Sequence, residues 1–366
     1  MTNAKSSGSA ASALALAPAR ALHYPFDAAP SPGGAIEVAP GVLWLRLDLP
    51  GPLAHINLWA IEESHGWTIV DTGLYTVHAV EAWESLLAGP LRGRPVIRVI
   101  ATHLHPDHVG MAGWLTKRFD CQLWMTRVDY LHCKALVADT GREPPQDAIR
   151  FYHRAGWDQE AIAQYRERFG RFGRMIFGFP DSYRRIVDGE WLTIGGRAWQ
   201  VVVGRGHTPE HACLLCPELG LLISGDQVLP RISSNVSVHP TEPDANPIGE
   251  WLDSIRALRM ALPGDVLVLP AHNEPFNGLH QRLARLEWGV IQSLARLRDA
   301  LAEPRRAVDA FVALFGRQIG SDDASNYGLA TGEAVAHLNY LMHAGEAIAE
   351  ADSDGVQWYV LRERDV

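Results

Sequence analysis

The stretch Ala101-Thr-His-Leu-His-Pro-Asp-His-Val-Gly110 places three histidines and one aspartate within six residues. The four side chains are His103, His105, Asp107 and His108. The stretch directly follows an apolar run, residues 96–100, whose composition and length predict a buried strand. So many ionisable groups cannot all be satisfied as core residues. The pattern predicts metal ligands, and the alternative interpretation is a histidine-rich surface loop.

The spacing of these residues indicates how they meet a metal. In an extended or tightly turned segment, positions i and i+2 point the same way, so His103 and His105 can share one cation. Asp107 and His108, beyond the turn, then face a second position nearby. Pro106 argues against a helix at this point.

Further polar motifs begin where other predicted strands end. They are Asp71-Thr-Gly73 after residues 67–70, Gly206-His-Thr-Pro-Glu-His211 after residues 199–203, Ser224-Gly-Asp226 after residues 220–223, and Pro270-Ala-His272 after residues 266–269. We expect one edge of a layered α/β sheet to collect these side chains.

The motifs, in this order, resemble those of the metallo-β-lactamase-fold hydrolases over about residues 41–276. The matching pieces are Asp71-Thr72-Gly73, His-x-His-x-Asp-His, Gly206-His207-Thr208, Ser224-Gly225-Asp226 and Ala271-His272. The resemblance points to the hydroxyacylglutathione hydrolase-like branch. It implies an α/β fold, namely an αββα sandwich with a two-metal site between the edges of its sheets.

The resemblance also implies a role for each motif residue. One metal would be held by His103, His105 and His207, the other by Asp107, His108 and His272, and Asp226 would bridge both. Asp107 and Asp226 would be catalytic, while Asp71 and His211 would fix the orientation of the ligands. Imidazole and carboxylate ligands suit zinc, and iron or manganese also fit.

Two positions refine the resemblance. His105 weighs against the flavodiiron branch of the fold, in which an acidic residue usually stands there. Glu210 stands where many relatives have glycine, which leaves the shape of the turn after His207 open.

The expected chemistry is hydrolysis by a hydroxide that bridges two divalent metal ions, because such ions bring the pKa of bound water to about 7. The leading hypothesis is a hydrolase of a thioester, ester or lactone with an apolar acyl portion. A phosphodiesterase or ribonuclease is the nearest alternative. A ligand-binding or signalling protein on a hydrolase scaffold is the third.

Composition bounds the partners. The 366 residues are 47% hydrophobic and carry a net charge of −9, which does not favour a nucleic-acid or membrane-surface binder. We therefore expect a small-molecule acyl substrate as the partner, no nucleic acid and no membrane, with a homodimer as an open option. The four cysteines suggest buried reduced thiols and hence a cytoplasmic protein. Residues 1–20, rich in Ala and Ser, predict a disordered leader.

Residues 21–276 form the predicted catalytic domain, which is interrupted by an aromatic-rich helical insertion at about residues 126–183. These rings either line an apolar substrate pocket or form a small core of their own, and we favour the small core for most of them. Phe177, Phe179 and Tyr183 are the pocket-facing candidates. In the loop at residues 228–243, which follows Asp226, we expect Arg231 and Asn235 to contact substrate.

Residues 277–366 predict a small helical, winged-helix-like domain. Helices are expected at residues 279–301, 306–315 and 331–344, followed by two short strands at residues 347–361 around the turn Asp352-Ser-Asp-Gly355. The ionisable groups of the last helix are Glu333, His337 and His343 rather than lysine or arginine. Packing or dimerisation is therefore favoured over nucleic-acid binding.

Overall fold

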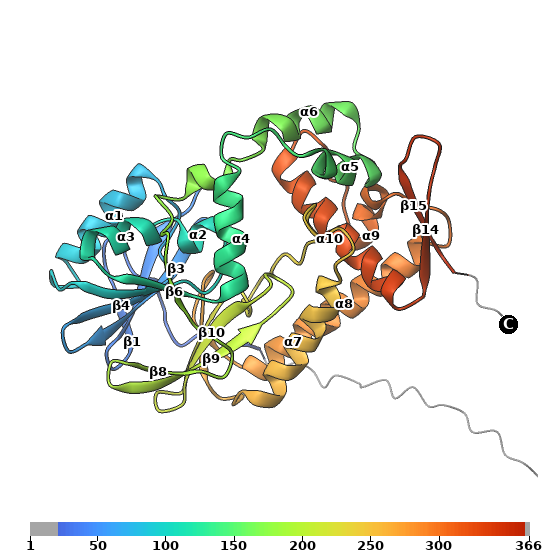
Figure 1. The fold of residues 1–366 in the computed structure, drawn as a ribbon. Coiled ribbons are helices and arrows are strands. Elements are labelled where there is room, and N and C mark those ends of the chain that lie inside the picture. The colour runs from blue at the N-terminus through green and yellow to red at the C-terminus, as the bar shows by residue number, and fades with distance from the viewer. Residues whose placement is uncertain (1–20, 363–366) are drawn as a thin grey trace, which may run out of the picture.

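The computed structural model describes residues 21–362, and over that range two β-sheets pack face to face with helices on both outer faces (Figure 1). This is the αββα sandwich that the sequence predicted. The expected leader, residues 1–20, lies outside the described residues. No helix among the described residues is long and apolar enough to cross a membrane.

The first sheet contains seven strands in chain order. They are β1 (Ile36–Ala39), β2 (Val42–Asp48), β3 (His55–Glu63), β4 (Gly66–Val70), β5 (Val96–Ile100), β6 (Gln122–Met125) and β7 (Arg184–Arg185). The pairs from β1 to β4 are antiparallel and those from β4 to β7 are parallel. The parallel half therefore presents the carboxyl ends of β4 and β5 at one edge, where Asp71 and His103 follow.

The second sheet has the order β13-β12-β11-β10-β9-β8. Its strands are β8 (Trp191–Ile194), β9 (Arg197–Gly204), β10 (His211–Cys216), β11 (Leu221–Gly225), β12 (Leu267–Pro270) and β13 (Phe276–Asn277). The β11–β12 pair is parallel, so Asp226 and His272 emerge at the same edge.

The helices cover the sheets and form the remainder of the molecule. They are α1 (Val77–Ala88), α2 (Pro106–Val109), α3 (Ala112–Phe119), α4 (Arg127–Ala138), α5 (Gln146–Arg154), α6 (Gln159–Arg168), η1 (Phe172–Met175), α7 (Pro247–Ala261), α8 (Leu279–Ala300), η2 (Ala307–Ala310), α9 (Phe311–Phe315) and α10 (Ala324–His343). A hairpin of β14 (Ala347–Ala351) and β15 (Gln357–Leu361) follows, joined through the predicted turn at Asp352–Gly355.

Arg184 and Arg185 pair with β6 in the first sheet, so the second sheet begins at β8. Two sequence expectations were wrong in detail. Pro106 does not prevent a helix. It occupies the first position of α2, where no amide donor is needed and the fixed φ of proline suits the helix. The last helix begins at Ala324 rather than at residue 331, because the side chain of Asp323 caps it.

The layer between the sheets is built from large apolar side chains on both inner faces. Trp44 and Trp59 come from the first sheet, and Trp199, Leu214 and Ile223 from the second. Strands buried on both faces explain the continuous apolar runs in the sequence. Helices α1 and α3 cover the outer face of the first sheet, and α7 and α8 cover that of the second.

The aromatic insertion does not form a core of its own, which corrects our expectation for most of its rings. Phe151 and Trp157 belong to the same buried cluster as α7, α8 and α10. The indole Nε1 of Trp157 donates to Thr331 Oγ1 of α10 at 2.9 Å. In Figure 1, α5 and α6 accordingly lie against α10, far from the first sheet. The middle of the insertion, α5 and α6, is therefore packed on the C-terminal helices, whereas its two ends, with Tyr130 and Tyr183, join the buried cluster of the first sheet.

Asn57 of β3 is fully buried and connects the two sheets through a hydrogen-bond network. Its Oδ1 accepts from Trp44 Nε1 at 2.8 Å, and its Nδ2 donates to the carbonyls of Pro270 at 2.9 Å and Asn273 at 2.6 Å. Its main-chain N–H donates to Ala271 O at 2.7 Å. These bonds fix the end of β12, and with it His272, against the first sheet.

We predict that Asn57→Ala lowers the free energy of unfolding by about 2–4 kcal/mol, because it removes the acceptor of the buried Trp44 indole N–H and one donor from each of the Pro270 and Asn273 carbonyls. Urea unfolding followed by tryptophan fluorescence measures the change. Gln281→Ala, at an exposed position of α8, is the control and should change stability by no more than about 0.5 kcal/mol. Equal effects of the two variants would contradict a bridging role for Asn57.

Candidate metal centre

Seven side chains from both sheets converge at the shared sheet edge in two groups. The first group is His103, His105, His207 and Asp226, and the second is Asp107, His108 and His272. Within each group, one ligand-capable atom per residue lies within 4.8 Å of the others. The structure thus brings together all seven residues that the resemblance implied as ligands, from four separate segments of the chain.

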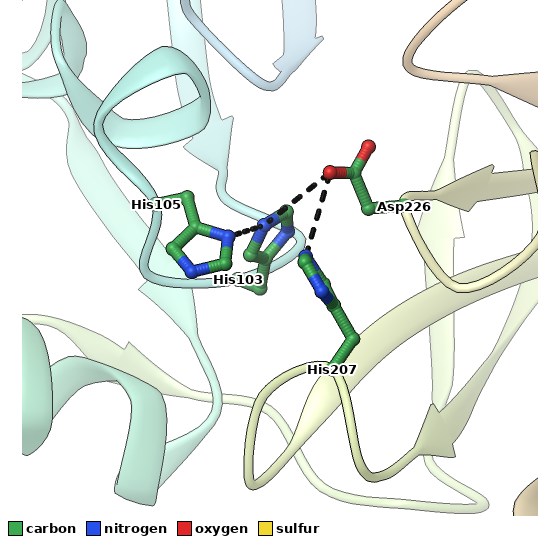
Figure 2. Close-up of side chains that lie close together, drawn as sticks. All are labelled: His103, His105, His207 and Asp226. Carbon is green, nitrogen blue, oxygen red and sulfur yellow. Dashed lines mark hydrogen bonds and ion pairs between the residues drawn. The ribbon is translucent and has the colours of Figure 1, made fainter. Parts of the chain in front are cut away.

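Figure 2 shows the first group, in which three imidazoles face the carboxylate of Asp226. His103 Nε2 lies 2.9 Å from His105 Nδ1. Asp226 Oδ2 lies 3.4 Å from His207 Nε2 and 4.0 Å from His103 Nε2. These atoms surround one small volume.

The second group uses the other oxygen of the same carboxylate. Asp226 Oδ1 lies 3.5 Å from His272 Nε2 and 3.6 Å from His108 Nε2. Asp107 Oδ2 lies 3.4 Å from His272 Nε2 and 3.7 Å from His108 Nε2. Asp226 therefore stands between the groups with one oxygen toward each, which is the arrangement of a bridging ligand.

Several of these atoms are buried without a hydrogen-bond partner. Among the described residues, His108 Nε2, His207 Nε2, His272 Nε2 and Asp226 Oδ1 are all in this state. Their separations of 3.4–3.6 Å exceed a normal hydrogen bond. They match the spacing of about 3.3 Å between tetrahedral ligands that each lie about 2.0–2.1 Å from a cation. The cluster therefore suits divalent metal ions.

The opposite ring nitrogens are held by acceptors in the surrounding structure. His207 Nδ1 donates to the Asn235 carbonyl at 2.7 Å, and His272 Nδ1 donates to the His55 carbonyl at 2.8 Å. His108 Nδ1 donates to Asp71 Oδ2 at 2.8 Å. Since Nδ1 carries the proton in each case, the Nε2 lone pair is directed into the cluster.

Asp71 is fixed in turn by Thr102. Its carboxylate accepts from the Thr102 main-chain N–H at 2.8 Å and from Thr102 Oγ1 at 2.9 Å. Asp71 adopts a left-handed φ of 61°, which is unusual for a residue with a side chain. These bonds hold the Asp71 carboxylate against His108 Nδ1, which is the position expected of a residue that orients this ring.

His211 supports Asp226 from behind. Its Nε2 accepts from the Asp226 main-chain N–H at 3.0 Å, and its ring lies against that of His103. Gly225 makes this approach possible, since a Cβ there would lie 2.6 Å from the His211 ring. The Ser224-Gly225-Asp226 motif thus needs its glycine for packing as well as for its left-handed φ of 49°.

Burial controls the charge of the imidazoles. Desolvation, followed by neighbouring histidines, holds the pKa of His103 and His211 well below the ordinary value and lowers the pKa of His105 to about 3. Neutral imidazole is the form that binds metal. Burial also works to lower the pKa of His108, but Asp71, Asp107 and Asp226 outweigh it and raise the pKa.

Asp129 of α4 is a structural contributor that the sequence analysis missed. It is fully buried, its Oδ1 accepts from Leu104 N at 3.1 Å, and its Oδ2 accepts from Glu210 N at 2.7 Å. Burial raises its pKa to about 6. Asp129 thus ties the loop of His103 and His105 to the loop of His207. Its sequence signal was only an acidic residue in the first turn of a helix.

Glu210, the unusual residue of the third motif, also contacts α4. Its Oε2 accepts from Val128 N at 3.0 Å, and its carbonyl accepts from Thr126 Oγ1 at 2.7 Å. A carboxylate at the start of a helix satisfies a free N–H and complements the helix dipole. Glu210 therefore anchors the first helix of the insertion beside the cluster.

The three aromatic side chains that we expected to face the substrate pocket pack against other aromatic rings of the protein. The ring of Tyr183 stacks on that of Tyr130 of α4, with 3.7 Å between the ring centroids. The ring centroid of Phe179 lies 5.3 Å from that of Tyr130. Phe177 packs against Tyr75. These rings support α4 and the first sheet, because an aromatic ring gains more from burial against another ring than from exposure at a loop.

The two residues of the loop after Asp226 that we expected to contact substrate also bind to other parts of the protein. Arg231 pairs with Glu274 at 3.1 Å and lies over the ring of Tyr24. The side chain of Asn235 bonds to Glu333 of α10, while its carbonyl holds His207. The structure thus places Asn235 beside a predicted ligand as a supporting residue and directs Arg231 to the surface.

We predict that Asp71→Asn weakens metal binding about 10–100-fold, the range found when a residue that orients a histidine ligand is removed. An amide can donate to His108 Nδ1 and so favours the wrong tautomer. Chelator competition measures the affinity. Asp120→Asn is the matched control, because Asp120 is exposed and also has a left-handed φ of 49°. Unchanged affinity in Asp71→Asn would refute the orienting role.

Comparison with known proteins places this geometry in a family. The model of the metallo-beta-lactamase superfamily matches residues 51–272, and that of a metallo-beta-lactamase-like C-terminal domain matches residues 294–362. The crystal structure of a beta-lactamase domain protein from Burkholderia ambifaria is 40% identical, with a TM-score of 0.85, and the match covers 93% of this chain and 98% of that one.

Three relatives of lower sequence identity were also found. A metallo-beta-lactamase family protein from Thermus thermophilus is 26% identical over 88% of this chain and 99% of its own, with a TM-score of 0.73. A probable metallo-hydrolase from Bacillus subtilis is 23% identical over 65% of this chain and 73% of its own. An atrochrysone carboxyl ACP thioesterase from Aspergillus terreus is 22% identical over 66% of this chain and 58% of its own. The chain belongs to the metallo-beta-lactamase superfamily and is a metal-dependent hydrolase with a metal-binding site of histidines and aspartates.

Proposed function

We propose that this protein hydrolyses a thioester, ester or lactone with an apolar acyl portion, using two divalent metal ions, most favourably zinc. The observation that carries the proposal is the position of Asp226, with one oxygen toward each group of imidazoles and Oδ1 buried without a hydrogen-bond partner. In this proposal His103, His105 and His207 hold one ion, and Asp107, His108 and His272 hold the other.

Two bound ions would supply a water of lowered pKa and polarise the substrate carbonyl. The chain's own residues perform the remaining tasks. Asp107, whose side chain is 18% exposed, lies at the accessible side of the cluster and is assigned to orient the attacking water and accept its proton. Asp71, His211 and Asn235 keep the ligands in place, so little reorganisation is needed during the reaction.

The relatives and the charge distribution support an acyl substrate over a phosphodiester. One relative is named as an acyl carrier protein thioesterase. Helix α10 contains no lysine or arginine, and most of its middle turns are buried. Arg231 already pairs with Glu274. Phosphate backbones are usually recognised by arginine and lysine, so nucleic acid is not the partner we propose.

We infer further that the acyl portion lies along α4. Its first turn is tied to the metal loops by Asp129 and Glu210. Val128 in this first turn and Leu131 in the next are 41% and 56% exposed although both are apolar. Exposed apolar side chains beside a polar centre are typical of a binding surface.

The finer family placement belongs to the same proposal. We infer a hydroxyacylglutathione hydrolase-like branch, with a winged-helix-like C-terminal part that serves packing. Cys121, Cys133, Cys213 and Cys216 are all free thiols. They fit the reducing, cytoplasmic location that we propose.

We predict about two zinc, iron or manganese ions per chain in freshly purified protein, and turnover of an acyl thioester or lactone that chelation abolishes. Asp226→Ala should reduce kcat/KM about 100-fold or more, because it removes the carboxylate between both ions. Elemental analysis and a panel of thioesters, lactones and phosphodiesters provide the measurements.

Other outcomes separate the alternatives. Cleavage of RNA that survives purification and is lost in Asp226→Ala would replace the acyl proposal with a phosphodiesterase or ribonuclease. Tight binding of an acyl or aromatic compound without turnover of any substrate would indicate a binding or signalling protein. One metal equivalent or less after reconstitution would contradict the dinuclear site.

We also predict that Leu131→Ser raises KM several-fold for long-chain acyl substrates and leaves short-chain turnover and metal content unchanged. The physical reason is the loss of apolar contact area, about 25 cal/mol per Å². Steady-state kinetics against a series of acyl chain lengths measures the effect. Met260→Ser, at an exposed apolar position of α7, is the control, and equal effects at all chain lengths would dismiss α4 as the acyl surface.

A further inference from the structure

The loop after Asp226 is fastened to α10, a helix of the C-terminal part. The main-chain N–H of Val238 donates to the Gly332 carbonyl at 3.0 Å, and Ser237 Oγ lies 3.4 Å from the Leu329 carbonyl. Gly332 permits this approach, since a Cβ there would lie 2.8 Å from the side chain of Ser237 and 2.9 Å from Val238 O. The loop and the helix are therefore in direct backbone contact.

Asn235 joins this contact to the metal centre. Its side-chain Nδ2 donates to Glu333 Oε2 of α10 at 2.8 Å, and its Oδ1 accepts from Ser237 Oγ at 2.5 Å. Its main-chain carbonyl accepts from His207 Nδ1 at 2.7 Å. Because both ends of the Asn235 side chain are bonded, the position of its carbonyl is fixed. The orientation of the His207 ring then depends on α10.

Glu333 is an unusual residue for its place. It lies on a helix turn between buried Gly332 and buried Ala334, and among the described residues its carboxylate has one hydrogen-bond partner, the Asn235 amide. Glu333 is itself partly buried, and a charged group costs more to bury than an apolar one. A carboxylate there also forms a stronger hydrogen bond to the amide than a neutral group does. The carboxylate of Glu333 thus holds the side-chain amide of Asn235.

We propose that Glu333 is a positioning residue for the metal centre: through Asn235 it fixes the His207 ring, so the C-terminal part helps to build one of the two metal positions. The inference rests on the proposed dinuclear site. It assigns α10 a role in the affinity of the metal site formed by His103, His105 and His207. The affinity of the site formed by Asp107, His108 and His272 should not depend on α10.

The test measures zinc release from the full-length, zinc-loaded protein by a chelator titration that resolves two steps. Glu333→Ala should weaken one step about tenfold, the lower end of the range for residues that orient ligands. Glu333→Gln keeps an acceptor for the Asn235 amide and should restore most of the affinity. Asp71→Asn, on the His108 side, should weaken the other step, and its effect should add to that of Glu333→Ala.

A pair of glycine variants separates positioning from general stability. Gly332→Ala inserts a methyl group between α10 and Ser237, and should weaken the same zinc step as Glu333→Ala. Gly328→Ala, on the same helix, meets nothing within 4 Å and should leave both steps unchanged. Both changes raise helix propensity, so a lower affinity in Gly332→Ala alone does not come from a weaker helix. Thermal unfolding of the metal-free proteins checks this point.

The outcomes are distinct. If the wild-type protein binds no divalent ion, the proposed function itself is wrong. Suppose instead that the wild-type protein binds two ions, and that Glu333→Ala and Gly332→Ala bind both ions with wild-type affinity. The dinuclear site then stands and the role of Glu333 is refuted. Equal weakening of both steps would also refute it, because positioning of His207 predicts an effect on one step.

Discussion

The carboxylate of Asp226 is the point on which the rest of the site depends. It lies between two groups of imidazoles, with Oδ2 3.4 Å from His207 and Oδ1 3.5 Å from His272. Buried carboxylates and imidazoles without partners are costly, and cations shared between them remove that cost. The chain therefore supports Asp226 from several sides, with His211 on its main-chain N–H and the Ser234 hydroxyl on its carbonyl.

Placing Asp226 correctly requires that two sheets from different halves of the chain meet at a fixed separation. Main-chain hydrogen bonds fix the separation of the two sheets at this edge. Ala212 N donates to Thr102 O at 2.7 Å, and Asn57 N donates to Ala271 O at 2.7 Å. The tryptophans between the sheets fill the space behind these bonds. The apolar layer thus provides the stability, while a few buried polar bonds set the geometry at the edge.

The parts of the chain outside the sandwich are connected to the same edge. Glu210 and Asp129 anchor α4 to the loops of the first metal group, and Glu333 meets the loop that carries Asn235. The middle of the insertion, α5 and α6, shares one buried core with the C-terminal helices, in which Trp157 bonds to Thr331. These segments form one supporting layer around the centre.

The sequence by itself determined the sandwich and the seven residues that converge, because strands with continuous apolar runs end at short polar motifs whose order is distinctive. It also indicated Asp71 and His211 as supports. It did not predict Asp129, Glu333 or the surroundings of Phe179 and Tyr183, because these contacts join positions 25 to nearly 100 residues apart and have no local periodicity. Only the tertiary structure decided that α5 and α6 of the insertion pack on α10, since which apolar faces cover one another depends on the geometry of the whole chain.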